Sequence, residues 1–204
     1  MDAIYFFGAI FYHCNKTGAT FQPGPLSLCK FQLMRRIFLL SFFISMLVTA
    51  GAQSIRKYPI GQSGCSFYSF CELKFEQSKS ADSSTIWSGE CVKEELTYGV
   101  ICVKLLNQIP ELPLAEDMLI SYADYLKTSF EITKSMGYGR GHLLQQKENT
   151  RGIIDYWSDL EKNNWKIKGW TDGKFIGFLY VYSKKELPEQ KINAFLDGFR
   201  FPGL

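Results

Sequence analysis

Histidine is scarce in this sequence, and its scarcity limits the catalytic chemistry that the chain can support. The only histidines among the 204 residues are His13 and His142, and only His142 follows residue 52. Its surroundings, GYGRGHLL, do not present a nucleophilic serine in a strand–turn–helix motif. A Ser/His or Cys/His nucleophile would have to use this one residue. We therefore expect His142 to be structural or exposed, and these hydrolase classes are disfavoured.

Glycine-rich cofactor motifs are also missing. The cluster Gly137, Gly139 and Gly141 lacks the G-x-G-x-x-G spacing of dinucleotide sites and the Lys-Ser/Thr that follows a phosphate-binding P-loop. No cofactor is predicted. The cluster is typical of a helix exit and turn, although its backbone amides together with Arg140 could contact an anion.

An excess of charge of one sign is absent from the part of the chain that follows residue 52. Residues 1–52 contain four basic residues and one acidic residue, so removing them leaves 19 of each sign from totals of 23 Lys+Arg and 20 Asp+Glu. Nucleic acid is therefore not a predicted partner. A neutral domain has little long-range steering, so recognition should depend on short-range contacts.

The acidic residues form no recognisable metal loop or catalytic pair. Asp155 and Asp159 would point to the same face of a strand at a separation of roughly 13 Å, given about 3.3 Å per residue. That exceeds the separation of about 5–9.5 Å seen in paired glycosidase carboxylates. Convergence of Asp155 with Glu161 or Asp172 keeps a carboxylate-based hydrolase open as the alternative function.

Long hydrophobic runs are missing too. The longest apolar run, Ile37–Val48, is about a dozen residues, short of the roughly 20 that a spanning helix needs. Arg35 and Arg36 precede it and Ala50-Gly51-Ala52 follows it, which is the arrangement of a cleavable secretory signal. The sequence thus predicts a signal peptide at 34–52, with no stable membrane span after cleavage. RR-x-F-L at Arg35–Leu39 also permits the twin-arginine route.

Residues 1–33 precede this signal and do not belong to an ordinary one. We interpret them as an upstream extension that starts before the true initiation site at Met34, or as a long n-region. They contain the only glycosylation sequon, Asn15-Lys16-Thr17. The remaining segment, 53–204, has the length of one domain, and we expect it in the periplasm or outside the cell.

Four of the six cysteines, Cys65, Cys71, Cys91 and Cys102, lie in that domain. No pair has C-x-x-C spacing, which disfavours a thiol oxidoreductase or a zinc ribbon. An even number in an exported chain predicts two disulfides. Because Cys91 and Cys102 flank a predicted turn, we expect Cys91–Cys102 and Cys65–Cys71, the alternative being that some are buried thiols.

Apolar periodicity predicts an α+β domain, with a mainly antiparallel sheet flanked by one long helix and a C-terminal helix. The expected helices are Leu114–Ile132, with a stripe at spacings of three and four, and a second one beginning at Pro188. Aromatic and β-branched runs predict these strands: Ser66–Phe75, Thr85–Val92, Tyr98–Leu105, Gly141–Gln146, Gly152–Leu160, Asn164–Thr171 and Lys174–Ser183. The first two should pair with each other. Asp172-Gly173 predicts a type I′ hairpin turn.

The closing pattern KFIGFLYVYS followed by INAFLDGFRF, a last strand and a short helix ending in F-L-x-x-F-R-F, resembles that of PsbP-like (Mog/PsbP type) proteins. Together with the order of strands, the resemblance covers most of 65–201. It implies an α/β/α sandwich and a binding or assembly role rather than an enzyme. It transfers no functional residue, because its motifs are packing motifs.

Aromatic residues interleaved with lysines are the remaining functional signal. Strand alternation places Lys166, Lys168 and Trp170 on one face, and with Trp157, Arg140 and His142 they form the candidate binding surface. The competing interpretation packs Trp170 under a helix. The sequence thus favours an exported non-enzymatic domain that binds an unknown protein or envelope component. A small-ligand or lipid carrier, with a pocket between the long helix and the sheet, is the other alternative.

Overall fold

The computed structural model describes residues 54–203 of the chain, which belong to one compact unit, Gln53–Leu204. The predicted upstream extension at 1–33, the signal peptide at 34–52 and the sequon at Asn15 lie outside the described residues. Neither of the two helices within 54–203 is long and apolar enough to cross a membrane.

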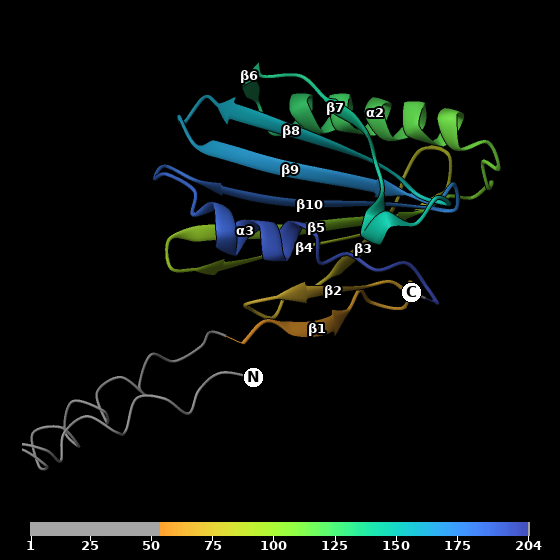
Figure 1. Cartoon of the computed structure of the whole chain (residues 1–204), viewed down its shortest axis with the longest axis horizontal. Coiled ribbons are helices and arrows are strands. Elements are labelled where there is room, and N and C mark those ends of the chain that lie inside the picture. Colours follow the sequence, from red (N-terminus) through yellow and green to blue (C-terminus); the bar gives the residue numbers. More distant parts are fainter. Residues whose placement is uncertain (1–53, 204) are drawn as a thin grey trace, which may run out of the picture. The chain divides into compact units, whose positions relative to one another are not determined.

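A large antiparallel sheet organises the fold (Figure 1). Its strands lie in the order β3-β4-β5-β10-β9-β8-β6, and β7 also pairs with β8. The bounds are β3 Glu76–Lys79, β4 Thr85–Lys93, β5 Leu96–Lys104, β6 Ile132–Ser135, β7 Gly139–His142, β8 Arg151–Asp159, β9 Asn164–Thr171 and β10 Phe175–Ser183. The near-continuous apolar run FIGFLYV puts β10 at the centre, where both faces are buried.

Two short strands, β1 Arg56–Pro59 and β2 Ser66–Ser69, form a separate hairpin. The prediction that 66–75 pairs with 85–92 is therefore wrong. β4 instead pairs with β3, whose four residues are all exposed. A short, polar edge strand gives no apolar alternation in the sequence, and such strands are typical of protected sheet edges.

The helices α2 (Leu112–Ser129) and α3 (Glu189–Leu196) lie on opposite faces of the large sheet (Figure 1). α2 packs on β8, β9 and β6, and α3 packs on β10 and β2. We call the two sides the α2 face, which bears Phe178 and Tyr180, and the α3 face, which bears Leu179 and Val181. The prediction of an α+β fold with one long and one C-terminal helix is confirmed.

The sequence explains where each helix begins and ends. α2 has Pro113 in its first turn, where no backbone donor is needed, and it buries Ala115, Leu119, Ala123 and Leu126. It ends three residues before the predicted Ile132, since Glu131 has a positive φ of 52°. Pro188 directly precedes α3, whose buried residues are Ile192, Phe195 and Leu196.

The turn between β9 and β10 differs from the type I′ turn that Asp172-Gly173 predicts. A type I′ turn needs positive φ at both central residues, yet at 172–174 only Gly173 is positive (φ 81°). Asp172 Oδ1 accepts hydrogen bonds from the backbone N–H groups of Lys174 and Phe175, which makes a longer turn. Two successive positive φ values occur instead at Glu94 and Glu95, between β4 and β5.

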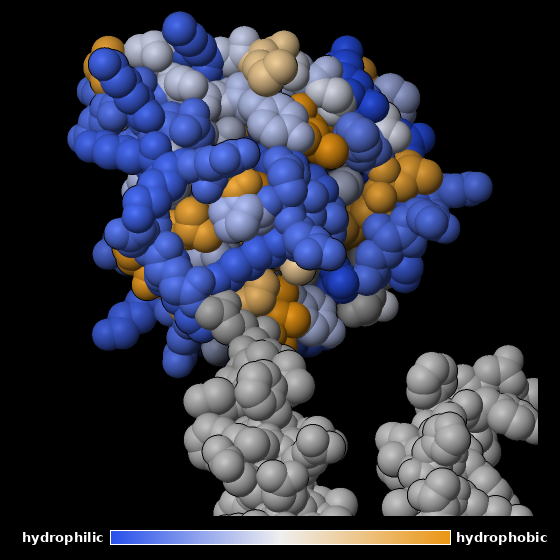
Figure 2. Space-filling view, turned by 60° about the vertical axis from the view of Figure 1, so that its left-hand side comes forward, coloured by the Kyte–Doolittle hydropathy of each residue, from blue (hydrophilic) through white to orange (hydrophobic). Residues whose placement is uncertain are grey.

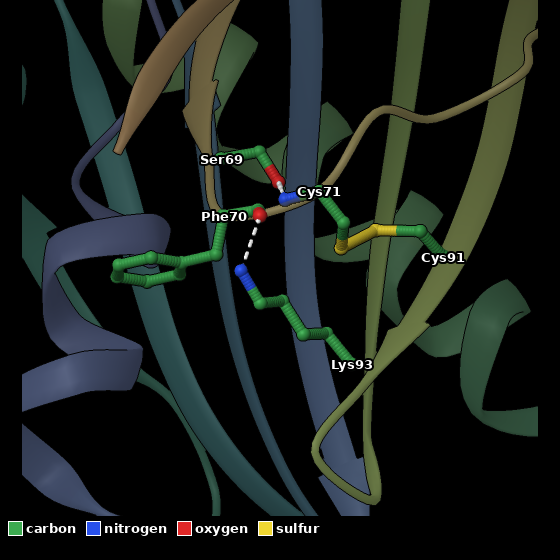
Figure 3. Close-up of a disulfide and its surroundings, with 5 residues drawn as sticks. All are labelled: Ser69, Phe70, Cys71, Cys91 and Lys93. Atoms are coloured by element: carbon green, nitrogen blue, oxygen red, sulfur yellow. Dashed lines mark hydrogen bonds between the residues drawn. A yellow bond between two sulfur atoms is a disulfide. The ribbon is translucent and has the colours of Figure 1, made fainter. Parts of the chain in front are cut away.

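The described cysteines contain one disulfide, Cys71–Cys91 (Figure 3). The predicted pairs Cys91–Cys102 and Cys65–Cys71 are wrong, because the β4–β5 register places Tyr98 opposite Cys91 and Trp87 opposite Cys102. The stretch after β2 reaches β4 instead. There Ser69 Oγ accepts from the Cys71 backbone N–H, and Lys93 Nζ donates to the Phe70 carbonyl. Cys65 and Cys102 are buried free thiols.

Candidate binding cleft

The residues that carried the predicted basic-aromatic surface lie beneath α3. Lys166, Lys168 and Trp170 share the α3 face, as alternation predicts, but only 4%, 8% and 3% of their surfaces are exposed. The prediction that they form an exposed surface is wrong. α3 covers this part of the sheet and provides their partners, which the distant sequence position of the helix concealed.

Each buried side chain of this group ends on a polar partner supplied by α3 or its C-terminal end. Lys166 Nζ lies 2.5 Å from Glu189 Oε2, and Lys168 Nζ lies 2.6 Å from Asp197 Oδ1. Trp170 Nε1 donates to the Leu196 carbonyl at 3.3 Å. The lysine stems thus pack in the core while their amino groups reach carboxylates at its rim.

Trp157, Arg140 and His142 lie elsewhere. Trp157 is on the α2 face and only 3% exposed. Arg140 Nη2 contacts Asp117 Oδ1 of α2 at 2.6 Å. The half-buried His142 pairs with Gly152 at the outer side of β8. The six predicted residues therefore form no common surface.

Two hydrogen-bond donors of the glycine-rich segment are engaged by α2. Besides the Arg140–Asp117 ion pair, the Gly141 backbone N–H donates to Glu116 Oε1 at 2.9 Å. Two carboxylates of α2 thus face the segment at the positions where an anion would approach. The geometry ties the segment to the helix rather than opening an anion site.

A cleft of about 930 Å³ lies where α3 leaves part of its own face uncovered. It is bounded by β6, the ends of β8 and β9, and the segment that enters α3. Its lining residues are Thr133, Lys134, Ser135, Met136, Tyr156, Trp157, Ser158, Asn164, Trp165, Glu186, Leu187 and Glu189. We call this the β8 cleft. Of the predicted surface, only Trp157 lines it directly.

Exposed apolar side chains line part of the β8 cleft. Met136 is 83% exposed and Tyr156 is 41% exposed, and both line the cleft with Leu187. Lys134 and Glu186 add charges of opposite sign. On the face shown in Figure 2, hydrophobic side chains (orange) are likewise scattered among hydrophilic ones (blue). An amphipathic lining of this kind suits a partner with both apolar and polar groups.

Lys166 connects the β8 cleft to the core. Its amino group lies 5.0 Å from the centre of the Tyr156 ring and contacts Glu189, so it bridges two residues of the lining. Burial opposes its charge, but the interactions with Glu189 and Tyr156 outweigh burial and raise the pKa of Lys166. The hydrogen bond from Lys166 lowers the pKa of Glu189. The pair is therefore charged at neutral pH and holds the start of α3 in place.

A buried carboxylate fixes the other wall of the β8 cleft. Asp155 is fully buried. Its Oδ2 accepts from Ser135 Oγ of β6 at 2.7 Å and from Trp157 Nε1 at 2.6 Å. Lys127 Nζ of α2 lies 3.5 Å from the same oxygen. This network ties β6 and α2 to β8, and so positions the neighbouring Met136.

Lys127 and Tyr138 extend this network to the surface. Lys127 Nζ donates to the Tyr138 hydroxyl at 2.6 Å, and that hydroxyl also bonds Asp124. Burial opposes the charge on Lys127, but Tyr138 and Asp155 outweigh burial, so the pKa of Lys127 is raised. Burial and the bond to Asp124 raise the pKa of Tyr138. The amine stays protonated and the phenol neutral, so neither group is prepared to act as a base at neutral pH.

Of the acids considered for a hydrolase, Asp155, Asp159 and Asp172 are engaged at separate points of the sheet, and Glu161 lines a pocket with Asp159 but not with Asp155. Asp155 is satisfied within the α2 face. Asp159 binds Asn163 and Trp165 Nε1 at the β8–β9 turn, and Asp172 holds the β9–β10 turn at the other end of these strands. Within residues 54–203, no group of three or more His, Cys, Asp or Glu side chains could hold a metal ion.

A second groove, of about 660 Å³, lies on the α2 face between α2 and the β3–β4 hairpin. Met118, Tyr122 and Tyr125 of α2 line it opposite Ile86 and Asp82. The carrier hypothesis expects a pocket between the long helix and the sheet. The groove has this position but opens to solvent along the helix.

Comparison with known proteins assigns no family to this chain. No protein-family model matches it, and no curated protein matches it significantly. The function therefore has to be inferred from the chemistry of the two grooves.

Proposed function

We propose that this chain is an exported, non-enzymatic binding or assembly domain that acts in the periplasm or outside the cell. The observation that carries the proposal is the β8 cleft, where Met136 and Tyr156 are exposed beside charges of both signs. Its partner is a protein or another envelope component that presents an apolar group flanked by polar ones. The apolar contact supplies affinity, and Lys134 and Glu186 supply orientation.

The rigid setting of the β8 cleft supports a binding role. Asp155 fixes β6 on one side, and the Lys166–Glu189 pair fixes the start of α3 on the other. Walls held in this way lose little conformational entropy when a partner binds. Helices on both faces of the sheet are also the layered arrangement that the PsbP-like resemblance implies, and that resemblance favours binding or assembly.

A small-ligand or lipid carrier is the second candidate, since Met118, Tyr122 and Tyr125 give the second groove, between α2 and the β3–β4 hairpin, an apolar wall. Titration with a fluorescent fatty acid distinguishes the two functions. Saturable binding that Met118→Ser abolishes and Met136→Ser leaves intact would favour the carrier.

Site-specific photo-crosslinking tests the role of the β8 cleft. A photoreactive amino acid at position 136 of the full chain, expressed in its native host, should give one discrete adduct identifiable by mass spectrometry. The matched control carries the same amino acid at Val92, which is also apolar and 73% exposed but outside the cleft. Tyr156→Ser should weaken the adduct at 136. Equal adducts at 92 and 136, or none at 136, would contradict the proposal.

Export is tested separately, by N-terminal sequencing and intact mass of the protein recovered from its host. Cleavage by a signal peptidase after Ala52 predicts a chain that begins at Gln53. A protein that begins at Met1 and stays in the cytoplasm would refute export. The crosslinking experiment would still decide separately whether the β8 cleft binds a partner.

A further inference from the structure

The two free thiols of residues 54–203 meet in the core of the α3 face. Cys65 is 2% exposed and Cys102 is 0% exposed, and both belong to the same hydrophobic cluster. The side chains of Cys65 and Ser63 lie close enough to the Cys102 thiol to shift its pKa. The two cysteines are therefore neighbours in the core although they are far apart in sequence.

The backbone on both sides explains why these thiols meet. Cys102 and Trp87 are cross-strand partners and share the α3 face. The turn before β2 packs on that pair: a Cβ at Gly61 would lie 2.6 Å from Trp87 Cδ1. Hydrogen bonds from Ile60 N–H to the Cys65 carbonyl and from Cys65 N–H to Ser63 Oγ close this turn and direct Cys65 towards β5.

We propose that Cys65 and Cys102 form a second disulfide when the chain folds in an oxidising compartment. Cys71–Cys91 already joins the stretch after β2 to β4. A Cys65–Cys102 bond would join the stretch before β2 to β5, so that both ends of β2 are linked covalently to the large sheet. The inference concerns the scaffold and does not depend on the ligand of the β8 cleft.

The chemistry requires an oxidant, which we identify as a small-molecule disulfide or a disulfide-bearing oxidoreductase. The thiolate of one cysteine attacks the oxidant's disulfide and releases one thiolate. The second cysteine then attacks the mixed disulfide and releases the other thiolate. The two cysteines lose two electrons and two protons, the oxidant gains the two electrons, and the released thiolates take up the protons.

Burial determines when the bond forms. In the folded protein the hydrogen bond with Cys65, together with burial, raises the pKa of Cys102, and the thiolate is the attacking species. Neither thiol is open to an external oxidant once the core has closed. The bond should therefore form during folding, before the core closes over the two thiols, and afterwards resist added reductant.

Oxidative refolding of the full chain tests the proposal. Cys14 and Cys29 are replaced by Ser, and the chain is reduced, denatured and refolded with reduced and oxidised glutathione. It is then alkylated in denaturant without reduction. We expect no alkylated cysteine by intact mass, and a Cys65–Cys102 peptide beside the Cys71–Cys91 peptide after non-reducing digestion.

Two matched variants keep the outcome interpretable. Cys65→Ser should leave one alkylated thiol, at Cys102, and retain Cys71–Cys91. The double variant Cys71→Ser/Cys91→Ser should still form Cys65–Cys102. Alkylation of both Cys65 and Cys102 after refolding would overturn the proposal, and so would peptides that pair either residue with another cysteine.

Discussion

The two faces of the large sheet are closed in different ways. On the α3 face, α3 shares the task with β2 and with the C-terminal residues, since Ser66 and Arg200 exchange backbone hydrogen bonds. On the α2 face, α2 is the one helix of residues 54–203 that packs on the sheet, and it leaves the groove beside β3 and β4 open. The α3 face, which several segments close, should therefore carry more of the stability, and the α2 face, which is covered mainly by one helix, should tolerate more change.

The buried charges differ in the same sense. The charged residues buried on the α3 face are the cations Lys166 and Lys168, whose carboxylate partners are 62% and 54% exposed. On the α2 face the buried charged residue is a carboxylate, Asp155, which has no exposed surface. A long stem lets a lysine send its charge to the rim, whereas the short aspartate has to be satisfied inside the protein. Charges with similar burial should thus differ in how much their removal destabilises the fold.

The largest expected effect is on the aromatic core of the α3 face. Phe195 is fully buried and contacts Tyr98 and Phe67 with ring centres 5.1 Å and 6.4 Å away. Phe195→Ala should lower the free energy of unfolding by about 3–5 kcal/mol. Leu119→Ala, the matched change on the α2 face, should fall near the lower end of about 2–5 kcal/mol. Denaturant unfolding measures both, and a larger loss for Leu119→Ala would reverse the comparison.

Removal of the buried negative charge should have the next largest effect. Asp155→Asn keeps the size but places an amide N–H₂ among groups that donate, including the Tyr156 backbone N–H at 2.8 Å. We expect a loss of about 1–3 kcal/mol in the free energy of unfolding. Ser135→Ala is the control, because it removes one donor and should lower stability by about 1 kcal/mol. Equal losses would mean that the carboxylate matters only through Ser135.

Whether a segment forms a helix or a strand could be predicted from this sequence far better than which strands pair and which helices pack on them. The strand at 164–171 was predicted with its observed bounds, because apolar and polar residues alternate from Asn164 to Lys168 and turn residues flank the run. β3 escaped prediction because its sequence, EQSK, has no apolar member. Edge strands depend on backbone pairing with a neighbour, which local composition does not encode.

The predictions of the disulfides and of the binding surface failed for a related reason. Both features depend on contacts between segments that are far apart in the sequence. Placing Cys71 beside Cys91 requires knowing that β2 pairs with β1 and that the stretch after β2 then reaches β4. Recognising Lys166 and Lys168 as buried requires knowing that α3 folds back over β9. Alternation placed the lysines on the correct face, but it could not show which helix covers that face.

The lysines should show a smaller effect, which depends on the stem more than on the charge. Lys168→Ala should lower the free energy of unfolding by about 2 kcal/mol, because it empties space under α3. Lys168→Met keeps the stem and loses only an ion pair with the half-exposed Asp197, so its effect should stay within about 1 kcal/mol. Thermal and denaturant unfolding of both variants test this. Equal destabilisation would show that the charge, not the packing, is what the α3 face requires.

The smallest expected effect is a pH dependence from Glu189. Lys166 holds the pKa of this carboxyl below its ordinary 4.5. The folded state therefore binds the proton less readily than the unfolded chain does. The pair contributes its full stability above about pH 4.5, and this contribution is lost as the pH falls through the lowered folded pKa.

Unfolding measured between about pH 3 and 6 should accordingly be less pH-dependent for Glu189→Gln than for the parent protein. Lys166→Met should flatten the profile in the same way, and combining the two changes should flatten it no further, because the shift belongs to the pair. A steeper acid loss in Glu189→Gln would assign the acid sensitivity of the α3 face to other carboxyls.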